Sequence, residues 1–302
     1  MDLTKLTTEQ SNAHTANLDE MSPLQIVQAM NREDATVPLA IEKELPIIAK
    51  VIEVTAVKLS NTGRLLYIGA GTSGRLGVLD AAECPPTFYT DPEMVQGLIA
   101  GGEKAMFKAI EGAEDSEQLG QQALQEIHLT KNDVVVGIAA SGRTPYVIGA
   151  LKYALEIGAT TVALSCNKNA EISQYAQHAI EVPVGPEVLT GSTRLKAGTA
   201  QKLVLNMIST GTMIQLGKAY NNLMIDVQPT NSKLVERAKY ILMQITNVSY
   251  ERAEQLLTMT DYRIKPAMLM EMANVDLETA GKLLENSRNK VKKALTLATG
   301  EK

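Results

Sequence analysis

The spacing of apolar residues changes along the chain. Between residues 22 and 59 apolar side chains recur at helical intervals, as at Ile41, Leu45 and Ile48, which predicts a helical arm. From Arg64 onward, short segments rich in Val and Ile alternate with stretches long enough for helices. These segments are residues 65–69, 94–100, 134–140, 160–165 and 179–184. Such alternation is typical of a parallel sheet with helices on both faces.

Proline and glycine residues mark where the intervening helices begin and end. Pro145 predicts the start of a helix that continues through Leu155 and ends at Gly158. A longer helix is expected over residues 199–220, and beyond Pro229 short amphipathic helices continue to the C-terminus. We therefore predict an α/β fold with a doubly wound parallel five-stranded sheet. The expected domains are an N-terminal helical arm (1–60), a sheet domain (61–228) and a small all-helical domain (229–302).

Composition narrows the class of protein. The 302 residues are 45% hydrophobic and 21% charged, as in globular proteins. A net charge of −5, no Trp and only two Phe offer little for nucleic-acid binding. Residues 1–20 are polar, unlike a signal peptide, and no run of about 18 apolar residues occurs. We expect a cytoplasmic protein with neither a nucleic-acid nor a membrane partner.

Metal-ligating residues are few. The two cysteines, Cys84 and Cys166, lie far apart in the sequence, and with only three histidines they do not form a zinc-ligand pattern. We therefore predict no metal site. Cys84 has no evident partner base, and we assign no catalytic role to it or to His128 and His178.

Three segments that follow predicted strands combine hydroxyls, glycine and a cation. Their sequences are GAGTSGR (69–75), ASGRTP (140–145) and GSTRLK (191–196). Ligands of such sheets bind outside the carboxyl ends of the strands, where helix N-termini attract phosphate. Tight turns with capping Ser or Thr explain any one of these segments, but they explain three together less well.

The first segment also spells G-x-G-x-x-G, which occurs in dinucleotide-binding proteins. That function needs a carboxylate about 20 residues further on to bind the ribose. The end of the next predicted strand reads IAGG (99–102) and supplies none. No G-K-[ST] occurs anywhere, which excludes a P-loop.

Two glutamates stand out near these segments. Glu83 lies in AAECPP (81–86), where the two prolines are expected to end a helix that began near Gly74. Glu114 lies in EGAEDS (111–116). Each also has an ordinary interpretation: Glu83 as an exposed acid, and Glu114 as a cap of the following helix, which local sequence alone favours.

The chain resembles the sugar isomerase (SIS) fold and, more narrowly, the N-acetylmuramic acid 6-phosphate etherase family, which is related to glucokinase regulatory protein. The motifs that carry the resemblance are residues 67–77, 83–88, 99–102, 111–115, 137–146 and, most tellingly, GPEVLTGSTRLKAGT (185–199). The resemblance extends from about residue 9 to about residue 233. The helical tail beyond it is only loosely characteristic and looks like a ubiquitin-associated-type bundle. Tyr89 departs from the pattern, because a glycine is expected there.

The resemblance implies removal of the D-lactyl ether from N-acetylmuramic acid 6-phosphate during peptidoglycan recycling. The expected products are N-acetylglucosamine 6-phosphate and D-lactate. The C2 proton of the open-chain sugar is acidified by the C1 aldehyde, so that a base eliminates lactate and water then adds. Two carboxylates suffice for this chemistry, and no cofactor is needed. By position in the family motif, Glu83 would protonate the departing oxygen and Glu114 would be the base at C2.

The resemblance also implies a set of substrate ligands and a quaternary structure. Hypothesised phosphate ligands are Ser73, Ser141, Arg143 and Thr144, with Thr72, Ser192 and Lys196 as second-rank candidates. Folds of this kind pair, so a homodimer is expected, and the site would be open to groups from the second copy. Two alternatives stay open, a non-catalytic sugar-phosphate sensor and an aldose–ketose isomerase of the same fold.

Overall fold

The computed structural model describes residues 6–108, 110–227 and 231–300. The chain forms two compact units, one of Met1–Ala82 with Pro92–Ser209 and the other of Glu83–Asp91 with Thr210–Lys302. The predicted domain boundary at residues 228 and 229 lies outside the described residues, and the boundary after residue 60 stays a prediction. Within the described ranges, no helix is long and apolar enough to cross a bilayer.

Five parallel strands form the sheet of the first unit, in the order β2-β1-β3-β4-β5. They are β1 (Leu65–Gly69), β2 (Val95–Ile99), β3 (Val134–Ala139), β4 (Thr160–Ser165) and β5 (His178–Glu181). Every residue of β1, β3 and β4 is buried, because both faces of the sheet are covered. This explains why the strands appear in the sequence as continuous apolar segments. The predicted five-stranded parallel sheet is confirmed.

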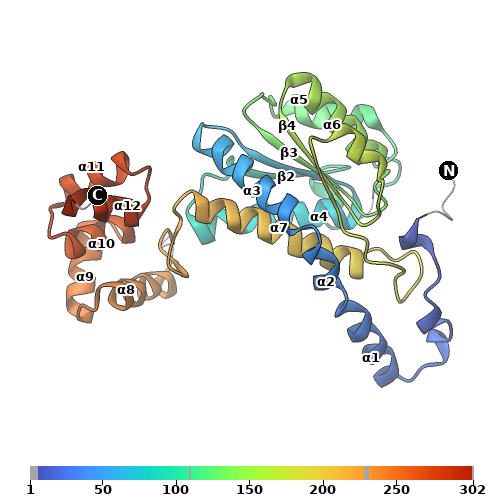
Figure 1. Cartoon of the computed structure of the whole chain (residues 1–302), viewed down its shortest axis with the longest axis horizontal. Helices are drawn as coiled ribbons and strands as arrows, with labels where there is room; N and C mark the ends of the chain where they lie inside the picture. Colours follow the sequence, from blue (N-terminus) through green and yellow to red (C-terminus); the bar gives the residue numbers. More distant parts are fainter. Residues whose placement is uncertain (1–5, 109, 228–230, 301–302) are drawn as a thin grey trace. The chain divides into compact units, whose positions relative to one another are not determined.

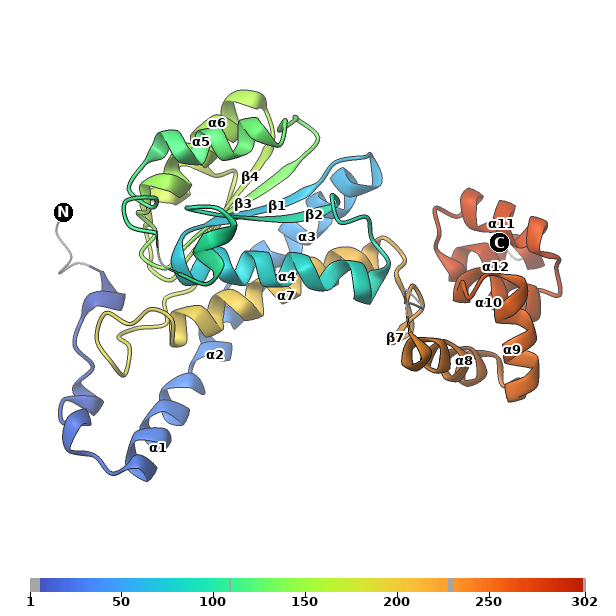
Figure 2. The same cartoon turned by 180° about the vertical axis from the view of Figure 1, so that it is seen from behind.

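Helices cover both faces of this sheet (Figures 1 and 2). On one face lie α5 (Glu117–Glu126) and α6 (Pro145–Ile157); on the other lie α3 (Leu45–Ser60), α4 (Gly71–Phe88) and α7 (Lys196–Gln215). The connection from β1 therefore crosses one face and the connection from β3 the other. The strand order reverses between these two neighbours, which makes them the topological switch point of the sheet.

The helix α6 shows how local sequence and core packing agree. It begins at Pro145 and ends where Gly158 takes a left-handed backbone with φ of 79°, as predicted. Its residues Val147 and Leu151 are fully buried in the same apolar cluster as Ile68 of β1. Burying each such side chain contributes roughly 1.5–3 kcal/mol.

The helix α4 differs from the prediction. Pro85 and Pro86 were expected to end it, but it continues through both to Phe88. The φ angle of proline suits a helix, and the cost is a missing N–H and crowding of the carbonyl one turn earlier. The helix ends at Tyr89, whose φ of 50° is left-handed. This conformation favours glycine, which explains why a glycine is expected at that position.

The helix α7 also differs in extent. It was expected over residues 199–220, but it begins at Lys196 and ends at Gln215. Gly217 then turns the chain with φ of 79° into a two-stranded hairpin of β6 (Ala219–Tyr220) and β7 (Leu223–Met224). The apolar residues of this hairpin continue the helical spacing, so hydrophobic pattern alone did not reveal the end of the helix.

The N-terminal arm precedes the sheet and consists of short helices. They are η2 (Thr7–Glu9), η3 (Ala13–Thr15), η4 (Leu18–Glu20), α1 (Pro23–Asp34) and α2 (Val37–Glu42), followed by α3. Ser22 and Gln25 form a capping box at the start of α1, which satisfies backbone donors that the helix leaves open. The helical nature of the arm was predicted.

The second unit contains the C-terminal helices, which have a core of their own. They are α8 (Ser232–Thr246), α9 (Tyr250–Met259), α10 (Ile264–Met272), α11 (Leu277–Asn286) and α12 (Val291–Thr299). All residues from Ile264 to Met270 are buried, so α10 is the central helix around which the others pack. Asn231, Ser249 and Asp276 cap the helices that follow them.

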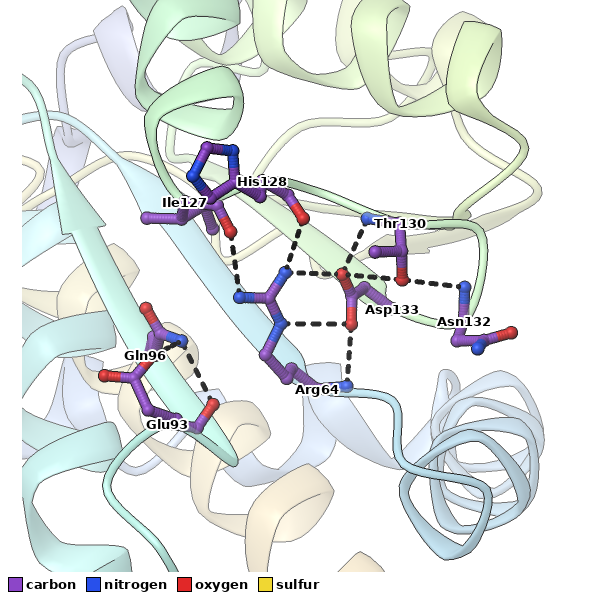
Figure 3. A network of polar contacts seen from close by, with 8 residues as sticks. All are labelled: Arg64, Glu93, Gln96, Ile127, His128, Thr130, Asn132 and Asp133. Atoms are coloured by element: carbon purple, nitrogen blue, oxygen red, sulfur yellow. Dashed lines mark hydrogen bonds and ion pairs between the residues drawn. The ribbon is translucent and has the colours of Figure 1, made fainter.

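An ion pair joins the amino ends of β1 and β3 (Figure 3). Arg64 Nη2 lies 2.8 Å from Asp133 Oδ2, and Arg64 Nε donates to Oδ1 at 3.2 Å. The same guanidinium donates to the carbonyls of Ile127 and His128, while the Thr130 N–H donates to Asp133. Asp133 is only 1% exposed. Burial opposes its charge, but the bonds from Arg64 and Thr130 outweigh this and lower the pKa of Asp133.

Replacing Asp133 with Asn should lower the free energy of unfolding by about 3 kcal/mol at neutral pH, because it leaves Arg64 without its anionic partner. The folded-state pKa of Asp133 lies below its unfolded value, so the stabilisation is complete above the unfolded pKa of about 3.9. It is lost as the pH falls through the folded-state pKa. Urea unfolding at several pH values should therefore show the wild type and Asp133→Asn converging in acid.

The matched control is Glu53→Gln, which removes an exposed ion pair with Lys50. It should change the free energy of unfolding by less than about 0.5 kcal/mol. If both variants lowered the free energy of unfolding by similar amounts, the ion pair of Arg64 and Asp133 would contribute no more to stability than an exposed pair.

Candidate functional site

The candidate site lies at the carboxyl edge of the sheet, where β1 and β3 end. The two strands are hydrogen-bonded neighbours, with Gly69 of β1 paired with Ile138 of β3. Neighbouring strands lie about 4.8 Å apart, so the segments that follow them emerge side by side. Each runs directly into a helix, α4 or α6, on opposite faces of the sheet. Two helix N-termini therefore meet at the switch point, where such folds bind ligands.

Gly71 allows the first of these segments to turn from strand into helix. Its φ of 52° is left-handed and suits only glycine without strain. The first backbone N–H groups of α4 have no partners within the helix, and they belong to the turn that carries Thr72 and Ser73. Ser73 is 7% exposed, and its hydroxyl donates to Oε1 of Gln201 at 3.0 Å.

The segment after β3 holds Ser141, Arg143 and Thr144 together. The Arg143 N–H donates to Ser141 Oγ at 3.3 Å, around Gly142 with φ of 73°. A Cβ atom at Gly142 would lie 2.4 Å from Cβ of Ala170, so only glycine fits. Thr144 precedes α6, but its side chain makes no capping hydrogen bond. Its hydroxyl is thus available to a ligand, and all three predicted residues are partly exposed.

The backbone of Glu114 is fixed to the same region. Its carbonyl accepts a hydrogen bond from the Tyr146 N–H, in the first turn of α6, at 3.0 Å. Ser116, rather than Glu114, caps α5 and accepts from the Leu119 N–H at 3.2 Å. The capping role that local sequence favours for Glu114 is therefore wrong. Its side chain is exposed, and its backbone is bonded to the helix that follows Ser141 and Thr144.

Arg75 holds the segment that leads from β2 toward Glu114. Its guanidinium donates to the carbonyls of Ala105 and Met106 at 2.7 and 3.0 Å. Because Arg75 belongs to the first turns of α4, the segment after β2 is tied to the Ser73 turn. Sequence reasoning noted this cation but gave it no function.

Glu83 belongs to the second compact unit. It lies within α4, two residues before Pro85, and is exposed. The first unit thus brings together Ser73, the 141–144 segment and the backbone of Glu114, whereas Glu83 belongs to the second unit.

The third hydroxyl-rich segment is anchored by a glutamate that sequence reasoning missed. Glu187 is fully buried, and its carboxylate accepts from the N–H groups of Lys196 and Ala197 at 2.9 and 3.0 Å. It therefore caps the N-terminus of α7. Burial raises the pKa of Glu187 despite these two bonds. An acid before the start of a helix is a recognisable signal, and Glu187 lies nine residues before Lys196. The signal was missed because the helix was predicted to start at residue 199, three residues too late.

Lys196 contacts the N-terminal arm. Its ammonium lies 2.6 Å from Oε2 of Glu33 in α1, and its side chain is 3% exposed. Burial opposes the charge of Glu33, but the bonds from Lys196, Asn12 and His14 lower its pKa overall. The Thr15 hydroxyl also donates to the Val188 carbonyl at 2.9 Å. Lys196 was predicted as a second-rank candidate for binding the substrate. In this structure its charge is already paired with Glu33.

A hollow of about 530 Å³ lies on the arm beside this ion pair. It is lined by His14, Thr15, Ala29, Arg32, Glu33 and Thr36. The hollow is distinct from the turns that carry Ser73 and Ser141. The hollow places the side chains of His14, Arg32 and Glu33 on one surface of the arm.

Asn167 connects the arm to the end of β3. Its Nδ2 donates to the Ala140 carbonyl at 3.0 Å and to Thr8 Oγ1 at 3.1 Å, while its Oδ1 accepts from the Thr7 N–H at 2.9 Å. Asn167 is 3% exposed. This residue was not predicted, because its partners lie far away in the sequence.

Metal-binding groups do not gather in the described residues: no three His, Cys, Asp or Glu side chains there are arranged to hold an ion. Both cysteines are buried. Burial and the nearby Glu187 raise the pKa of the Cys166 thiol, which disfavours the reactive thiolate.

Comparison with known proteins adds three family matches. The N-terminal SIS domain of glucokinase regulatory protein matches residues 47–155, the SIS domain matches residues 110–210, and the C-terminal lid domain of glucokinase regulatory protein matches residues 221–301. The matches cover the sheet domain and the C-terminal helices.

Curated relatives are similar over most of the chain. N-acetylmuramic acid 6-phosphate etherase 2 of Enterococcus faecalis is 61% identical over 89% of this chain and 91% of its own length. The protein of the same name in Lactiplantibacillus plantarum has the same identity and coverage. The N-acetylmuramic acid 6-phosphate etherase of Bacillus cereus is 60% identical over 88% of this chain and 91% of its own.

Solved structures support the fold alone. A phosphoheptose isomerase from Francisella tularensis aligns with a TM-score of 0.50 and 14% identity, over 64% of this chain and 100% of its own. The phosphoheptose isomerase of Neisseria gonorrhoeae aligns with a TM-score of 0.50 and 20% identity, over 63% and 98%. These values confirm the SIS-type architecture of the sheet domain.

The ion pair on the arm yields a test of stability. Glu33→Gln leaves the buried ammonium of Lys196 without its anion, so the free energy of unfolding at neutral pH should fall by about 3 kcal/mol. Adding Lys196→Met should recover much of that loss, because no charge then remains buried. Urea unfolding followed by circular dichroism measures both effects.

Glu44→Gln is the matched control, because Glu44 pairs with Lys168, which is 51% exposed and keeps its hydration. Its effect should stay below about 1 kcal/mol. A Glu33→Gln variant as stable as Glu44→Gln would contradict the assignment of a buried pair.

Proposed function

This chain belongs to the N-acetylmuramic acid 6-phosphate etherase family, and we propose that it performs the family's reaction with two glutamates and no cofactor. The enzyme cleaves the D-lactyl ether at C3 of N-acetylmuramic acid 6-phosphate, giving N-acetylglucosamine 6-phosphate and D-lactate. The observation that carries this function is 61% identity over 89% of the chain. The two helix N-termini at the switch point supply the anion site that such a substrate needs.

The substrate phosphate would bind at the turns after β1 and β3. Ser73, Ser141 and Thr144 offer hydroxyl groups there, and Arg143 offers a guanidinium. The open N–H groups at the starts of α4 and α6 add backbone donors. Phosphate oxygens only accept hydrogen bonds, so an edge composed of donors favours this group. Thr72, Ser192 and Lys196 remain second-rank ligands, and Lys196 would first have to leave Glu33.

The reaction balances without an oxidant or a second substrate other than water. A base removes the C2 proton of the open-chain aldehyde, the C2–C3 double bond forms, and the C3–O bond breaks. The departing lactate oxygen takes a proton from an acid. Water then adds its hydroxyl to C3 and a proton to C2, which restores a saturated sugar.

We assign the base at C2 to Glu114 and the acid at the departing oxygen to Glu83. Glu114 has an exposed carboxylate on a backbone that is bonded to the first turn of α6. This supports a position within reach of a sugar whose phosphate binds beside Thr144. Glu83 is an exposed carboxylate of α4, and its assignment is supported by its position in the motif of residues 83–88 that resembles the family.

We further propose that two copies associate through the N-terminal arm. Large apolar side chains are exposed on three of its helices: Leu24 and Val27 on α1, Leu39 on α2, and Val57 on α3, each more than half exposed. Four large apolar side chains exposed on one short arm are more typical of a surface that contacts another protein chain than of one that faces solvent. We also propose that the chain is divided into domains at residues 1–60, 61–228 and 229–302. We further propose that the protein is cytoplasmic.

Purified protein incubated with N-acetylmuramic acid 6-phosphate should release D-lactate. Glu83→Gln and Glu114→Gln should each bind the substrate but lose turnover by roughly 10²–10⁴-fold. In deuterated water, Glu83→Gln should still exchange the C2 hydrogen, because deprotonation precedes loss of lactate, whereas Glu114→Gln should not.

Glu111→Gln is the matched control, because Glu111 is an exposed acid of the same turn; its turnover should stay near that of the wild type. Native-rate exchange by Glu114→Gln would refute the base assignment. Tight substrate binding without lactate would instead indicate a sensor, and conversion between aldose and ketose would indicate an isomerase.

The proposed interface predicts that the wild type sediments as a dimer and that Leu24→Glu with Leu39→Glu sediments as a monomer, because two carboxylates would have to be buried. Sedimentation velocity measures both. Leu297→Glu in α12, which is 48% exposed in the wild type, should leave the dimer intact. A monomeric wild type, or a dimeric double variant, would exclude the arm as the interface.

A further inference from the structure

Gln201 is a buried amide beside the proposed phosphate site. It lies in the second turn of α7 and is 1% exposed. Its Oε1 accepts the hydroxyl hydrogen of Ser73 at 3.0 Å. Its Nε2 has no hydrogen-bond partner among the described residues. An unpaired buried donor costs free energy and calls for an explanation.

The hydrogen bond between Ser73 and Gln201 conflicts with phosphate binding. A serine hydroxyl has one hydrogen to donate, and here it is directed at Gln201. Phosphate oxygens are acceptors, so they require that same hydrogen. Ser73 therefore cannot donate to the phosphate while Gln201 presents its oxygen.

Rotating the carboxamide by half a turn removes the conflict. The terminal torsion of glutamine has a broad, roughly two-fold profile, so the oxygen and nitrogen can exchange places. Nε2 would then donate to Ser73 Oγ, and the hydroxyl hydrogen would be free to point at a ligand. The same rotation gives one of the two unpaired N–H groups a partner.

We propose that Gln201 is a positioning residue of the phosphate site, which acts by turning its carboxamide so that Ser73 donates to the phosphoryl group of the substrate. This rests on the proposed role of Ser73 as a phosphate ligand. Bound ligand selects the orientation with nitrogen toward Ser73, and the ligand-free protein keeps the orientation with oxygen toward Ser73.

The packing of α7 against α4 gives Gln201 a fixed place for this role. The two helices run side by side (Figures 1 and 2). A second hydrogen bond further along joins them, from Ser209 Oγ to Asp80 Oδ1 at 3.1 Å. The start of α7 is held by the bonds of Glu187 to Lys196 and Ala197. The backbone is thus constrained, so the proposed change is confined to the terminal torsion of the Gln201 side chain.

Gln201→Met keeps the length of the side chain and removes its donor and acceptor. We expect KM for the substrate to rise about threefold, because no amide N–H then orients the Ser73 hydroxyl toward the phosphate, with little change in kcat. The inhibition constant of inorganic phosphate should rise in parallel, whereas that of D-lactate should not. Gln201→Glu, which only accepts, should weaken phosphate binding further.

The variants are compared with Ser73→Ala and with the double variant. If Gln201 acts through Ser73, Gln201→Met should raise KM in the wild type but have no further effect once Ser73 is Ala. Thr212→Val is the control, because Thr212 is a fully buried residue of the same helix with an unpaired hydroxyl; its KM should match the wild type. The urea midpoint of Gln201→Met should change little, because the variant removes an unpaired amide N–H together with the acceptor of the Ser73 hydroxyl.

Each contrary outcome has a distinct meaning. An unchanged KM in Ser73→Ala would refute the phosphate assignment and this inference together. A raised KM in Ser73→Ala with a normal KM in Gln201→Met and Gln201→Glu would refute only the role of Gln201. Equal effects of Gln201→Met with and without Ser73, or equal weakening of phosphate and D-lactate, would show that Gln201 does not act through Ser73.

Discussion

The order of the strands is the constraint on which the site depends. Because β1 and β3 are neighbours whose following helices cross opposite faces, two helix N-termini meet at one edge without a strand between them. Their open N–H groups and partial positive charge make that edge receptive to an anion before any side chain is considered. Ser73 and Ser141 then add hydroxyls to a place that the topology has already selected. The same residues on strands further apart would not converge.

The edge is held in place by segments from outside the sheet. Asn167 joins the end of β3 to the first residues of the arm, and Lys196 joins the start of α7 to Glu33 of α1. Both connections are partly buried, where a hydrogen bond or ion pair is harder to replace with water than on the surface. The arm therefore contributes to the geometry of the ligand segments as well as presenting apolar surface to solvent. A change in α1 would reach the start of α7 through one ion pair.

Patterns within short stretches of sequence were enough to predict the sheet and the turns that carry Ser73, Ser141 and Thr144, because burial on both faces and strand-to-helix turns leave local signals. The effect of Pro85 and Pro86 on the helix was predicted wrongly. Each proline removes a backbone N–H, but the sequence does not say whether the helix continues without that hydrogen bond. The roles of Lys196 and Gln201 were out of reach. Their partners, Glu33 and Ser73, lie 163 and 128 residues away in the sequence, and only the fold brings them together.

The two edges of the sheet differ in how completely their polar groups are paired. At the amino edge, both oxygens of Asp133 accept hydrogen bonds from Arg64, and Thr130 donates another, so this carboxylate is occupied within the fold. At the carboxyl edge, Gln201 keeps an unpaired donor and the hydroxyl of Thr144 is not used as a cap. The unpaired buried donor of Gln201 reduces the stability of the free protein, whereas the partly exposed hydroxyl of Thr144 is open to water. The ion pair of Arg64 and Asp133 joins β1 and β3 at one end, and the unpaired donor is tolerated near the other.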